Sequence, residues 1–357
     1  MKRFIHILAW NLLLLAAGLV CLELAFGGWI REDPFRKLHV PTHIDREYAL
    51  KGLYPGPDTI LYTRDRYGLR GAYPSPDRID ILTVGGSTTD QAYIADGETW
   101  QDDLAKALGD KGYPACVVNA GIDGHSTHGH LKNFEWWFPR IPGFAPRCIL
   151  YYTGINDIFA ETPPYEADRG WRGLVVEKSI SYRIYRILRG ALLARKYDIG
   201  HGRVDFAAQR WTDQPLASPA VYDEVFRDRL AAYSGRVRAL IEKTRALGAL
   251  PVFVTQQTRM FRRDGGRVTG IEDAFEFHGH LFNGVDRYHI LEMYNNVVRR
   301  VCRETGTLCV DLADDLALTD GDFYDFMHNT PAGTLKIGDF LAEELAKNPD
   351  FREQVLR

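Results

Sequence analysis

Short apolar runs alternate with stretches of helical periodicity over most of the chain. Runs rich in Val, Ile, Leu, Tyr and Cys predict buried strands at 79–84, 116–119, 148–153, 250–255 and 307–311. Between them, apolar positions recur at helical spacing and predict helices over 100–108, 222–247 and 285–303. This alternation predicts an α/β fold, a three-layer α/β/α domain with a five-stranded parallel sheet. In such a sheet, ligands bind at the carboxyl ends of the strands.

The N-terminus carries a much longer apolar run. Residues 4–22 contain no Asp, Glu, Lys or Arg, and a helix of that length at about 1.5 Å per residue just spans a hydrocarbon core of about 30 Å. A cleavable signal peptide is the alternative, since Ala25-Phe26-Gly27 is a small-x-small site. The length of the run favours a retained membrane anchor over 1–30, that is, an N-terminal transmembrane helix. Basic residues lie on both sides of the run, so the orienting charge bias is weak: Lys2 and Arg3 precede it, and Arg31, Arg36 and Lys37 follow it. We expect a single-pass membrane protein whose main domain lies outside the cytoplasm.

Two segments interrupt the strand–helix alternation. Residues 31–78 are rich in Pro, Gly, Tyr and Arg without sustained periodicity, which predicts a juxtamembrane linker before a main domain over 79–357. Residues 160–220 look like an insertion, and within it 179–196 predicts a basic amphipathic helix. Its apolar residues are Ile180, Ile184, Ile187, Leu188 and Leu192, and its basic residues are Arg183, Arg186, Arg189, Arg195 and Lys196. Such a helix lies on an anionic membrane, contacts an acidic glycan, or packs on the domain with a solvated face; the pattern fits all three.

The composition is that of a globular protein. The chain has 357 residues, 45% hydrophobic and 25% charged, and a formal net charge of −3, which gives no general attraction to nucleic acid. The five cysteines form no C-x-x-C motif and adjoin apolar segments, so we expect buried free thiols. Two histidine groups, one of His125, His128 and His130 and one of His278 and His280, have metal-like spacing. No Cys or carboxylate completes a recognised zinc pattern beside them, so we expect no metal.

Four polar segments follow predicted strands or precede the last predicted helix. Gly85-Gly86-Ser87 follows the first strand, and its serine is either a presented hydroxyl or a helix N-cap. Residues 119–127 follow the second strand, with Gly124 able to offer a backbone N–H or simply to form a turn. Asn156, after the third strand, suits an amide donor to negative charge or an Asx turn. His328 lies just before Thr330 and Pro331, which look like the cap and first residue of the last helix, and Asp325 lies three residues before it.

Taken in order, these segments resemble the SGNH hydrolases, also called the GDSL esterase/lipase superfamily. The resemblance covers about 79–347 and implies an SGNH, flavodoxin-like fold with no metal and no organic cofactor. It implies that Ser87 is the nucleophile, His328 the general base and Asp325 the carboxylate that orients His328. It also implies an oxyanion hole made by the backbone N–H groups of Ser87 and Gly124 and the Asn156 side chain. One departure is Gly86, which stands where the name-giving motif has Asp. Because that residue is not a member of the triad, the departure bears on the subfamily to which the chain belongs and not on its chemistry.

These residues suit the hydrolysis of an ester. A serine hydroxyl is a poor nucleophile and needs a base such as histidine. General base catalysis contributes about 10²–10⁴-fold and one oxyanion donor about 10²–10³-fold, which suffices for an ester more readily than for an unactivated amide. We therefore expect a membrane-anchored serine esterase acting on an O-acyl group, such as acetyl, of a cell-envelope glycan or lipid. An O-acyltransferase with the same site and a non-catalytic glycan-binding scaffold are the alternatives. The polar loop over 256–283 is positioned to overhang the site.

Overall fold

The computed structural model describes the chain except for residues 1, 31–34, 36–37, 161–170, 198–200 and 357. The chain forms two compact units. The larger unit contains residues 40–160 and 202–357, and the smaller unit contains residues 1–39 and 161–201.

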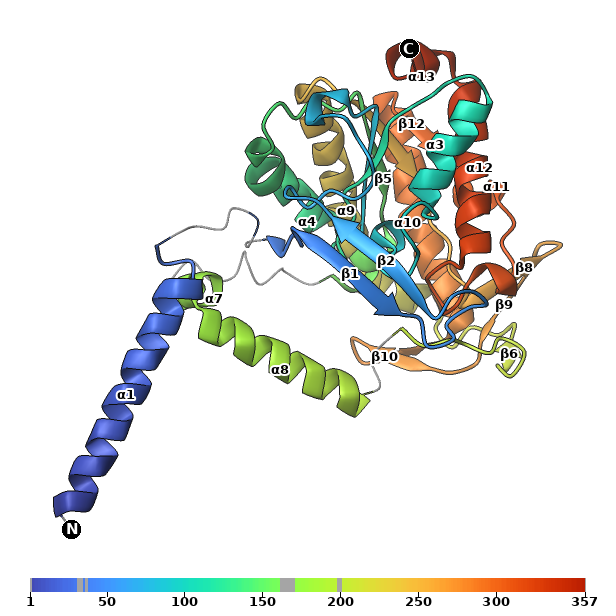
Figure 1. Cartoon of the computed structure of the whole chain (residues 1–357). Coiled ribbons are helices and arrows are strands. Elements are labelled where there is room, and N and C mark those ends of the chain that lie inside the picture. Colours follow the sequence, from blue (N-terminus) through green and yellow to red (C-terminus); the bar gives the residue numbers. More distant parts are fainter. Residues whose placement is uncertain (1, 31–34, 36–37, 161–170, 198–200, 357) are drawn as a thin grey trace. The chain divides into compact units, whose positions relative to one another are not determined.

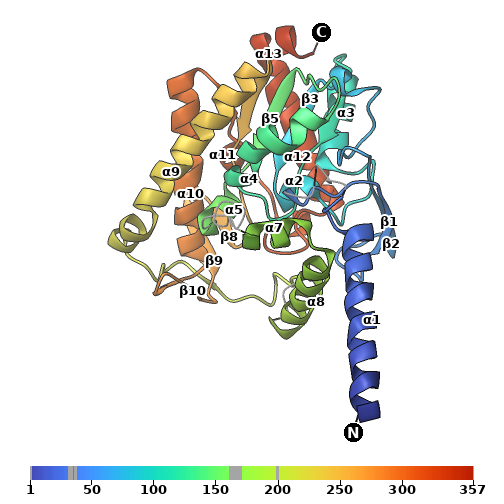
Figure 2. The same cartoon turned by 90° about the vertical axis from the view of Figure 1, so that its left-hand side faces the viewer.

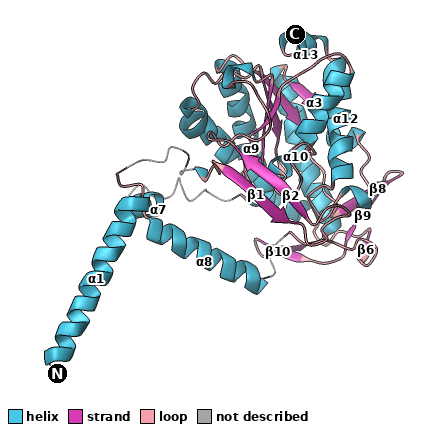
Figure 3. Cartoon of the chain, viewed as in Figure 1, coloured by secondary structure: helices cyan, strands magenta, loops and turns pink. Residues whose placement is uncertain are grey.

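A five-stranded parallel sheet forms the centre of the larger unit (Figure 1, Figure 3). Its strands are β3 (Ile81–Gly85), β4 (Val117–Asn119), β5 (Cys148–Tyr152), β7 (Leu250–Val254) and β12 (Leu308–Val310), in the order β12-β7-β5-β3-β4. All neighbouring strands are parallel. The five predicted strands and the α/β class are thus confirmed.

Helices cover both faces of this sheet (Figure 2). On one face lie α3 (Trp100–Asp110) and α12 (Pro331–Lys347), and the other face is covered by α9 (Pro219–Ala246) and α10 (Gly284–Thr305). Successive side chains of a strand point to opposite faces of the sheet. Leu150 of β5 belongs to the cluster beneath α3 and α12, whereas the Tyr151 hydroxyl forms a hydrogen bond with the Thr244 hydroxyl of α9 at 2.6 Å.

The remaining helices of this unit are short. They are α2 (Ser87–Asp90), α4 (Thr127–Lys132), α5 (Ile155–Phe159), α11 (Leu312–Asp315) and α13 (Pro349–Gln354), with 3-10 turns at Pro76–Arg78, Phe138–Arg140 and Asp320–Asp322 and a π turn at Asn133–Trp137.

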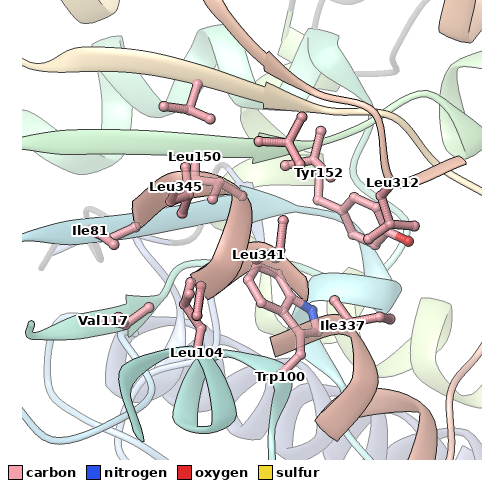
Figure 4. Close-up of a cluster of buried hydrophobic side chains, with 14 of the residues drawn as sticks. Ile81, Trp100, Leu104, Val117, Leu150, Tyr152, Leu312, Ile337, Leu341 and Leu345 are labelled. Atoms are coloured by element: carbon pink, nitrogen blue, oxygen red, sulfur yellow. The ribbon is translucent and has the colours of Figure 1, made fainter. Parts of the chain in front are cut away.

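The main hydrophobic core lies between the sheet and the α3–α12 pair (Figure 4). Trp100 and Leu104 of α3 are fully buried, and Ile337 and Leu341 of α12 are 1% exposed. The two helices approach closely at Gly338, where a Cβ would lie 2.4 Å from the Cβ of Asp103. This packing fixes the start of α12, and the loop before it, against the sheet.

The segment expected to be a linker is folded instead. Strands β1 (Ile44–Ala49) and β2 (Thr59–Arg64) pair antiparallel, and residues from 40 onward belong to the larger unit. The inward residues of β2, such as Ile60 and Tyr62, pack in a second cluster with Ile94 and Tyr324. The sequence did not predict this hairpin, because β1 is almost wholly exposed and β2 buries only alternate residues.

The segment 256–283 is also more ordered than a loop. It contains β8 (Phe261–Asp264), which pairs with β9 (Arg267–Ile271), and β10 (Phe275–Phe277), which pairs with β11 (His280–Phe282). Strand β9 also pairs with β6 (Trp211–Thr212), so part of the expected insertion belongs to the larger unit. These strands are short and mostly half-exposed, which leaves no clear alternation in the sequence.

The smaller unit consists of α1 (Lys2–Phe26), α7 (Trp171–Lys178) and α8 (Ile180–Tyr197). The most apolar 18-residue window of α1, within Arg3–Phe26, has a mean hydropathy of 2.2 and none of it is buried, so the helix is long and apolar enough to span a membrane or to be a signal sequence. The predicted basic amphipathic helix corresponds to α8. Residues 161–170 and 198–200 of the expected insertion lie outside the described residues.

Candidate active site

The predicted nucleophile lies at the carboxyl end of the central sheet. Strand β3 ends at Gly85, Gly86 caps α2, and Ser87 is the first residue of that helix. A Cβ at position 86 would lie 2.2 Å from Nδ2 of Asn156 and 3.1 Å from the carbonyl oxygen of His125. Glycine at this position therefore lets the Asn156 side chain approach the backbone of the nucleophile turn.

A chain of hydrogen bonds joins Ser87, His328 and Asp325. Nε2 of His328 lies 2.8 Å from Oγ of Ser87, and Nδ1 of His328 lies 2.7 Å from Oδ2 of Asp325. The other Asp325 oxygen accepts from the backbone N–H groups of Met327 and His328, at 2.8 and 2.7 Å. The Tyr324 ring stacks on the His328 ring at a centroid distance of 5.7 Å. The imidazole is thus held on its Nδ1 edge and on one face, while Nε2 points to the serine.

The loop holding His328 is fixed by the helix that follows. Thr330 is the N-cap of α12, where its hydroxyl accepts from the Gly333 N–H, and Pro331 is the first helical residue. Both positions agree with the sequence prediction. However, α12 is not the last helix, because α13 follows it.

Asn156 lies beside the serine turn, on the first turn of α5. Its Nδ2 donates to the His125 carbonyl oxygen at 2.9 Å. Ser87, His125 and Asn156 all line one pocket, together with Gly86, Thr88, Tyr152, Thr153, Gly154, Ile155, Gln256 and Met327. Gly124, the other predicted oxyanion residue, is exposed with φ +72° and directly precedes His125 in the chain.

The orientation of α5 depends on a buried ion pair. Asp157 accepts hydrogen bonds from the hydroxyl of Thr127 at 2.5 Å and from the Thr127 N–H at 3.2 Å. Arg236 of α9 donates to the Thr127 hydroxyl at 2.7 Å and lies 3.3 Å from the Asp157 carboxylate. Burial raises the pKa of Asp157, and the bonds from Thr127 and the charge of Arg236 oppose that rise. These contacts join α4, α5 and α9 behind Asn156.

Gln256 connects the two sides of the pocket. Its Nε2 donates to the Thr88 hydroxyl at 3.2 Å and to the Tyr152 carbonyl at 3.3 Å, and its Oε1 accepts from the Ile155 N–H at 2.8 Å. One side chain just after β7 thus contacts both α2, which begins with Ser87, and α5, which carries Asn156. In the sequence, Gln256 is marked only as the first residue of a polar loop.

The second positioning group comes from β2. Arg64 is fully buried, and its guanidinium donates to Asp90 at 2.5 Å and to the Gly121 carbonyl at 2.6 Å. Its remaining partners are the Tyr62 hydroxyl and the Gly68 carbonyl, both at 2.6 Å. Asp90 is the last residue of α2, which begins with Ser87, and Gly121 lies in the loop that leads to Gly124. No local pattern indicated Arg64, since its role depends on contacts with residues far along the chain.

The two histidine groups lie in different surroundings. The His125 and His130 rings lie 6.0 Å apart, and burial lowers the pKa of His130, which keeps its ring neutral. His278 contacts Arg229 at 2.8 Å, and His280 lies 3.8 Å from Glu224. Within the described part of the chain, neither group converges with other ligating side chains to make a set of three.

Comparison with known proteins identifies the family. The model of the GDSL-like lipase/acylhydrolase family matches residues 83–334, well over half of the chain. A comparison with curated protein sequences returned no match. Similar solved structures include an acetylxylan esterase from Geobacillus stearothermophilus (16% identity, TM-score 0.41, 74% of this chain and 92% of that chain). A putative lipolytic protein of the G-D-S-L family from Desulfitobacterium hafniense is also similar (11% identity, TM-score 0.40, 74% of this chain and 98% of that chain). The chain therefore belongs to the GDSL-like lipase/acylhydrolase family, the SGNH hydrolases, and is a carboxylic ester hydrolase.

Proposed function

We propose that the chain is a membrane-anchored serine esterase that removes an O-acyl group, such as acetyl, from a cell-envelope glycan or lipid outside the cytoplasm. The observation that carries this proposal is the continuous hydrogen-bonded series from Asp325 through His328 to Ser87. A binding module has no need of a base aligned on a serine hydroxyl and a carboxylate aligned on that base.

In this mechanism Oγ of Ser87 attacks the ester carbonyl while Nε2 of His328 takes the serine proton. Asp325 keeps the Nδ1 proton of His328 in place and stabilises the imidazolium. The tetrahedral intermediate breaks its bond to the alcohol oxygen, which leaves with the proton from His328. A water molecule then attacks the acyl-enzyme with the same proton transfers, releasing the carboxylic acid and restoring Ser87.

The developing negative charge on the carbonyl oxygen needs donors that are already oriented. We assign these to the backbone N–H groups of Ser87 and Gly124 and to the Asn156 amide. The hydrogen bond from Asn156 to the His125 carbonyl orients that amide, and a primary amide has a second N–H for the oxyanion.

The pocket suits a small acyl group. The space beside Ser87 is small, only about 260 Å³ even when its open mouth is counted. An acyl group of a few carbon atoms fits this space better than a fatty acyl chain. The alcohol part of the ester is then left outside the pocket, as expected for a hydroxyl of a large glycan or lipid.

Membrane anchoring is assigned to α1. The apolar helix covers 24 residues from Arg3 to Phe26. Large apolar side chains are exposed along its whole length; the Leu14 side chain, for example, is 65% exposed. Exposed apolar surface of this extent needs a lipid or protein environment. A retained anchor would hold the enzyme beside envelope substrates.

The test is the substitution Ser87→Ala in the full-length protein. We expect hydrolysis of an acetyl ester such as p-nitrophenyl acetate to fall by several orders of magnitude, and labelling by a fluorophosphonate probe to disappear, while circular dichroism is unchanged. Ser75→Ala, at a half-buried serine whose hydroxyl donates to Asp77, is the matched control and keeps both ester hydrolysis and probe labelling. A folded Ser87→Ala protein with near-normal turnover would falsify the proposal.

A further inference from the structure

The end of α1 is joined to the start of α8 by one carboxylate. Glu23 accepts hydrogen bonds from the Ser179 hydroxyl at 2.7 Å and from the backbone N–H groups of Ile180 and Ser181 at 3.1 and 3.0 Å. It also accepts from the Trp29 indole at 2.8 Å. The unpaired N–H groups and the positive dipole end of a helix N-terminus favour a carboxylate. Glu23 thus acts as a cap for α8 although it belongs to α1.

A backbone hydrogen bond reinforces this junction. The Gly28 N–H donates to the Lys178 carbonyl at 2.8 Å. A Cβ at Gly27 would lie 3.0 Å from that same carbonyl. The chain after α1 therefore contacts the residue that directly precedes the α8 cap, so α8 starts where α1 ends.

The two faces of α8 differ in chemistry and both are exposed. Ile184, Leu188 and Leu192 recur every four residues, with Ile187 beside them, and their exposed fractions run from 41% to 69%. Arg183, Arg186 and Arg189 recur every three residues on the opposite side and are exposed as well. Among the described residues, α8 therefore presents an exposed apolar stripe and, opposite it, an exposed basic stripe.

We propose that α8 lies in the interface of the membrane that α1 spans, with its apolar stripe among the upper acyl chains and its arginines against anionic headgroups. The proposal rests on the membrane anchoring of the proposed function. Glu23 is the first ionisable residue after the uncharged run over 4–22, so it lies where the hydrocarbon ends and water begins. Because Glu23 caps α8, that helix begins at the same depth.

A lipid interface accounts for both stripes of α8, and the other partners account for one each. An acidic glycan would bind the arginines and leave the apolar stripe in water. A protein surface would cover the apolar stripe and gain little from the arginines. Anionic lipid offers acyl chains and phosphate groups within one helix diameter of each other.

The experiment places a photo-crosslinker at single positions of the full-length protein in nanodiscs. Leu188→p-benzoylphenylalanine tests the apolar stripe. The same change at Leu14 in α1 is the control for anchoring, and at Leu216, a 53% exposed leucine of the larger unit, the control for random contact. After illumination, mass spectrometry identifies what is attached at each position. We expect lipid adducts at positions 14 and 188 and none at 216.

Two variants test the contacts that carry the argument. Replacing Arg183, Arg186 and Arg189 together by Gln should reduce the adduct yield at 188 in phosphatidylglycerol discs but not in phosphatidylcholine discs, since each arginine near an anionic surface is worth about fivefold. Glu23→Gln should reduce the yield at 188 in both lipids and leave the yield at 14 unchanged. Neither variant should alter hydrolysis of a soluble acetyl ester, because these residues lie in the smaller unit and Ser87 in the larger.

The outcomes separate the two proposals. Lipid adducts at 14 without adducts at 188 overturn the placement of α8 and leave the anchor standing. Absence of lipid adducts at both positions overturns the placement and the anchor together, while Ser87 labelling still tests the esterase. Attachment of position 188 to a peptide of the larger unit shows that α8 packs on protein, which overturns the proposal. Equal adduct yields at position 188 in phosphatidylglycerol and phosphatidylcholine discs overturn the contact between the arginines and the anionic headgroups.

Discussion

At the scale of single residues, Asn156 combines two tasks in one amide. It contacts the serine turn at Gly86, and one N–H donates to His125. We predict that Asn156→Asp, which keeps the shape but removes the donors, lowers kcat by about 10²–10³ and changes KM little, because an oxyanion donor acts mainly in the transition state. Steady-state kinetics on a soluble acetyl ester checks this, with a thermal melt as the control for folding. A loss that appears only in KM would assign Asn156 to substrate binding.

The His328–Asp325 pair makes a second prediction. The short contact at 2.7 Å sets which ring nitrogen carries the proton. We expect Asp325→Asn to lower kcat, His328→Ala to lower it further, and the double variant to be little worse than His328→Ala, because residues that act as a unit are non-additive. The four kcat values form a double-mutant cycle. Additive losses in that cycle would mean that the two residues work independently.

The residues proposed to perform the chemistry were easier to find in the sequence than those that hold them. Ser87, Asn156, Asp325 and His328 lie in short local motifs, and the structure brings their side chains to one place. Arg64 and Gln256 have no motif, because their partners at Asp90, Gly121 and Ile155 are set by the tertiary fold. A sequence pattern reports neighbours in the chain, whereas a positioning residue is defined by neighbours in space.

At the scale of elements, α3 and α12 approach each other closely at Gly338. A Cβ at Gly338 would lie 2.8 Å from the backbone nitrogen of Leu104, which cannot move without shifting α3. We predict that Gly338→Ala lowers the free energy of unfolding by about 1–3 kcal/mol through overpacking. The matched control is Gly109→Ala on α3, where no atom among the described residues lies within 4 Å of the new Cβ. That change should raise stability by about 0.5–1 kcal/mol.

Urea denaturation of both variants measures the difference. Equal effects of the two substitutions would show that helix propensity alone acts at both sites and that the crossing tolerates a methyl group. The expected opposite signs would instead identify Gly338 as a packing requirement between α3 and α12. Because α12 follows the His328 loop, a loss of kcat in Gly338→Ala would connect this crossing to the site.

The central strands of the predicted sheet share one property, burial on both faces. Strands β3, β5 and β7 are almost entirely buried and appear as plain apolar runs. The hairpins β1–β2 and β8–β9 were missed because one or both of their faces meet solvent, and polar residues such as Arg262 and Arg263 interrupt the pattern. Predicting them needs the surface onto which they fold, which a single sequence does not supply.

At the scale of the whole molecule, the boundary of the larger unit decides what an active fragment must contain. The sequence suggested a start at residue 79, whereas the unit begins at residue 40. The hairpin between these points carries Arg64, whose partner Asp90 is 5% exposed. Removing one partner of a buried ion pair leaves an uncompensated charge, at a cost of about 3–5 kcal/mol. That is a large fraction of a typical stability of about 5–15 kcal/mol.

We therefore predict different fates for two truncated chains. The chain 40–357 should hydrolyse a soluble acetyl ester with the kcat/KM of the full-length protein, because it keeps the whole larger unit. The chain 79–357 should melt at a lower temperature and lose activity, since it lacks the residues that bind Asp90 and Gly121. Adding Asp90→Asn to the shorter chain should recover part of the stability, because it removes the unpaired charge, but not the activity, because the loop at Gly121 remains unsupported. Thermal melts and ester hydrolysis in mild detergent measure both quantities. If 79–357 melts and turns over like 40–357, the hairpin contributes nothing to the site and the positioning role of Arg64 is wrong.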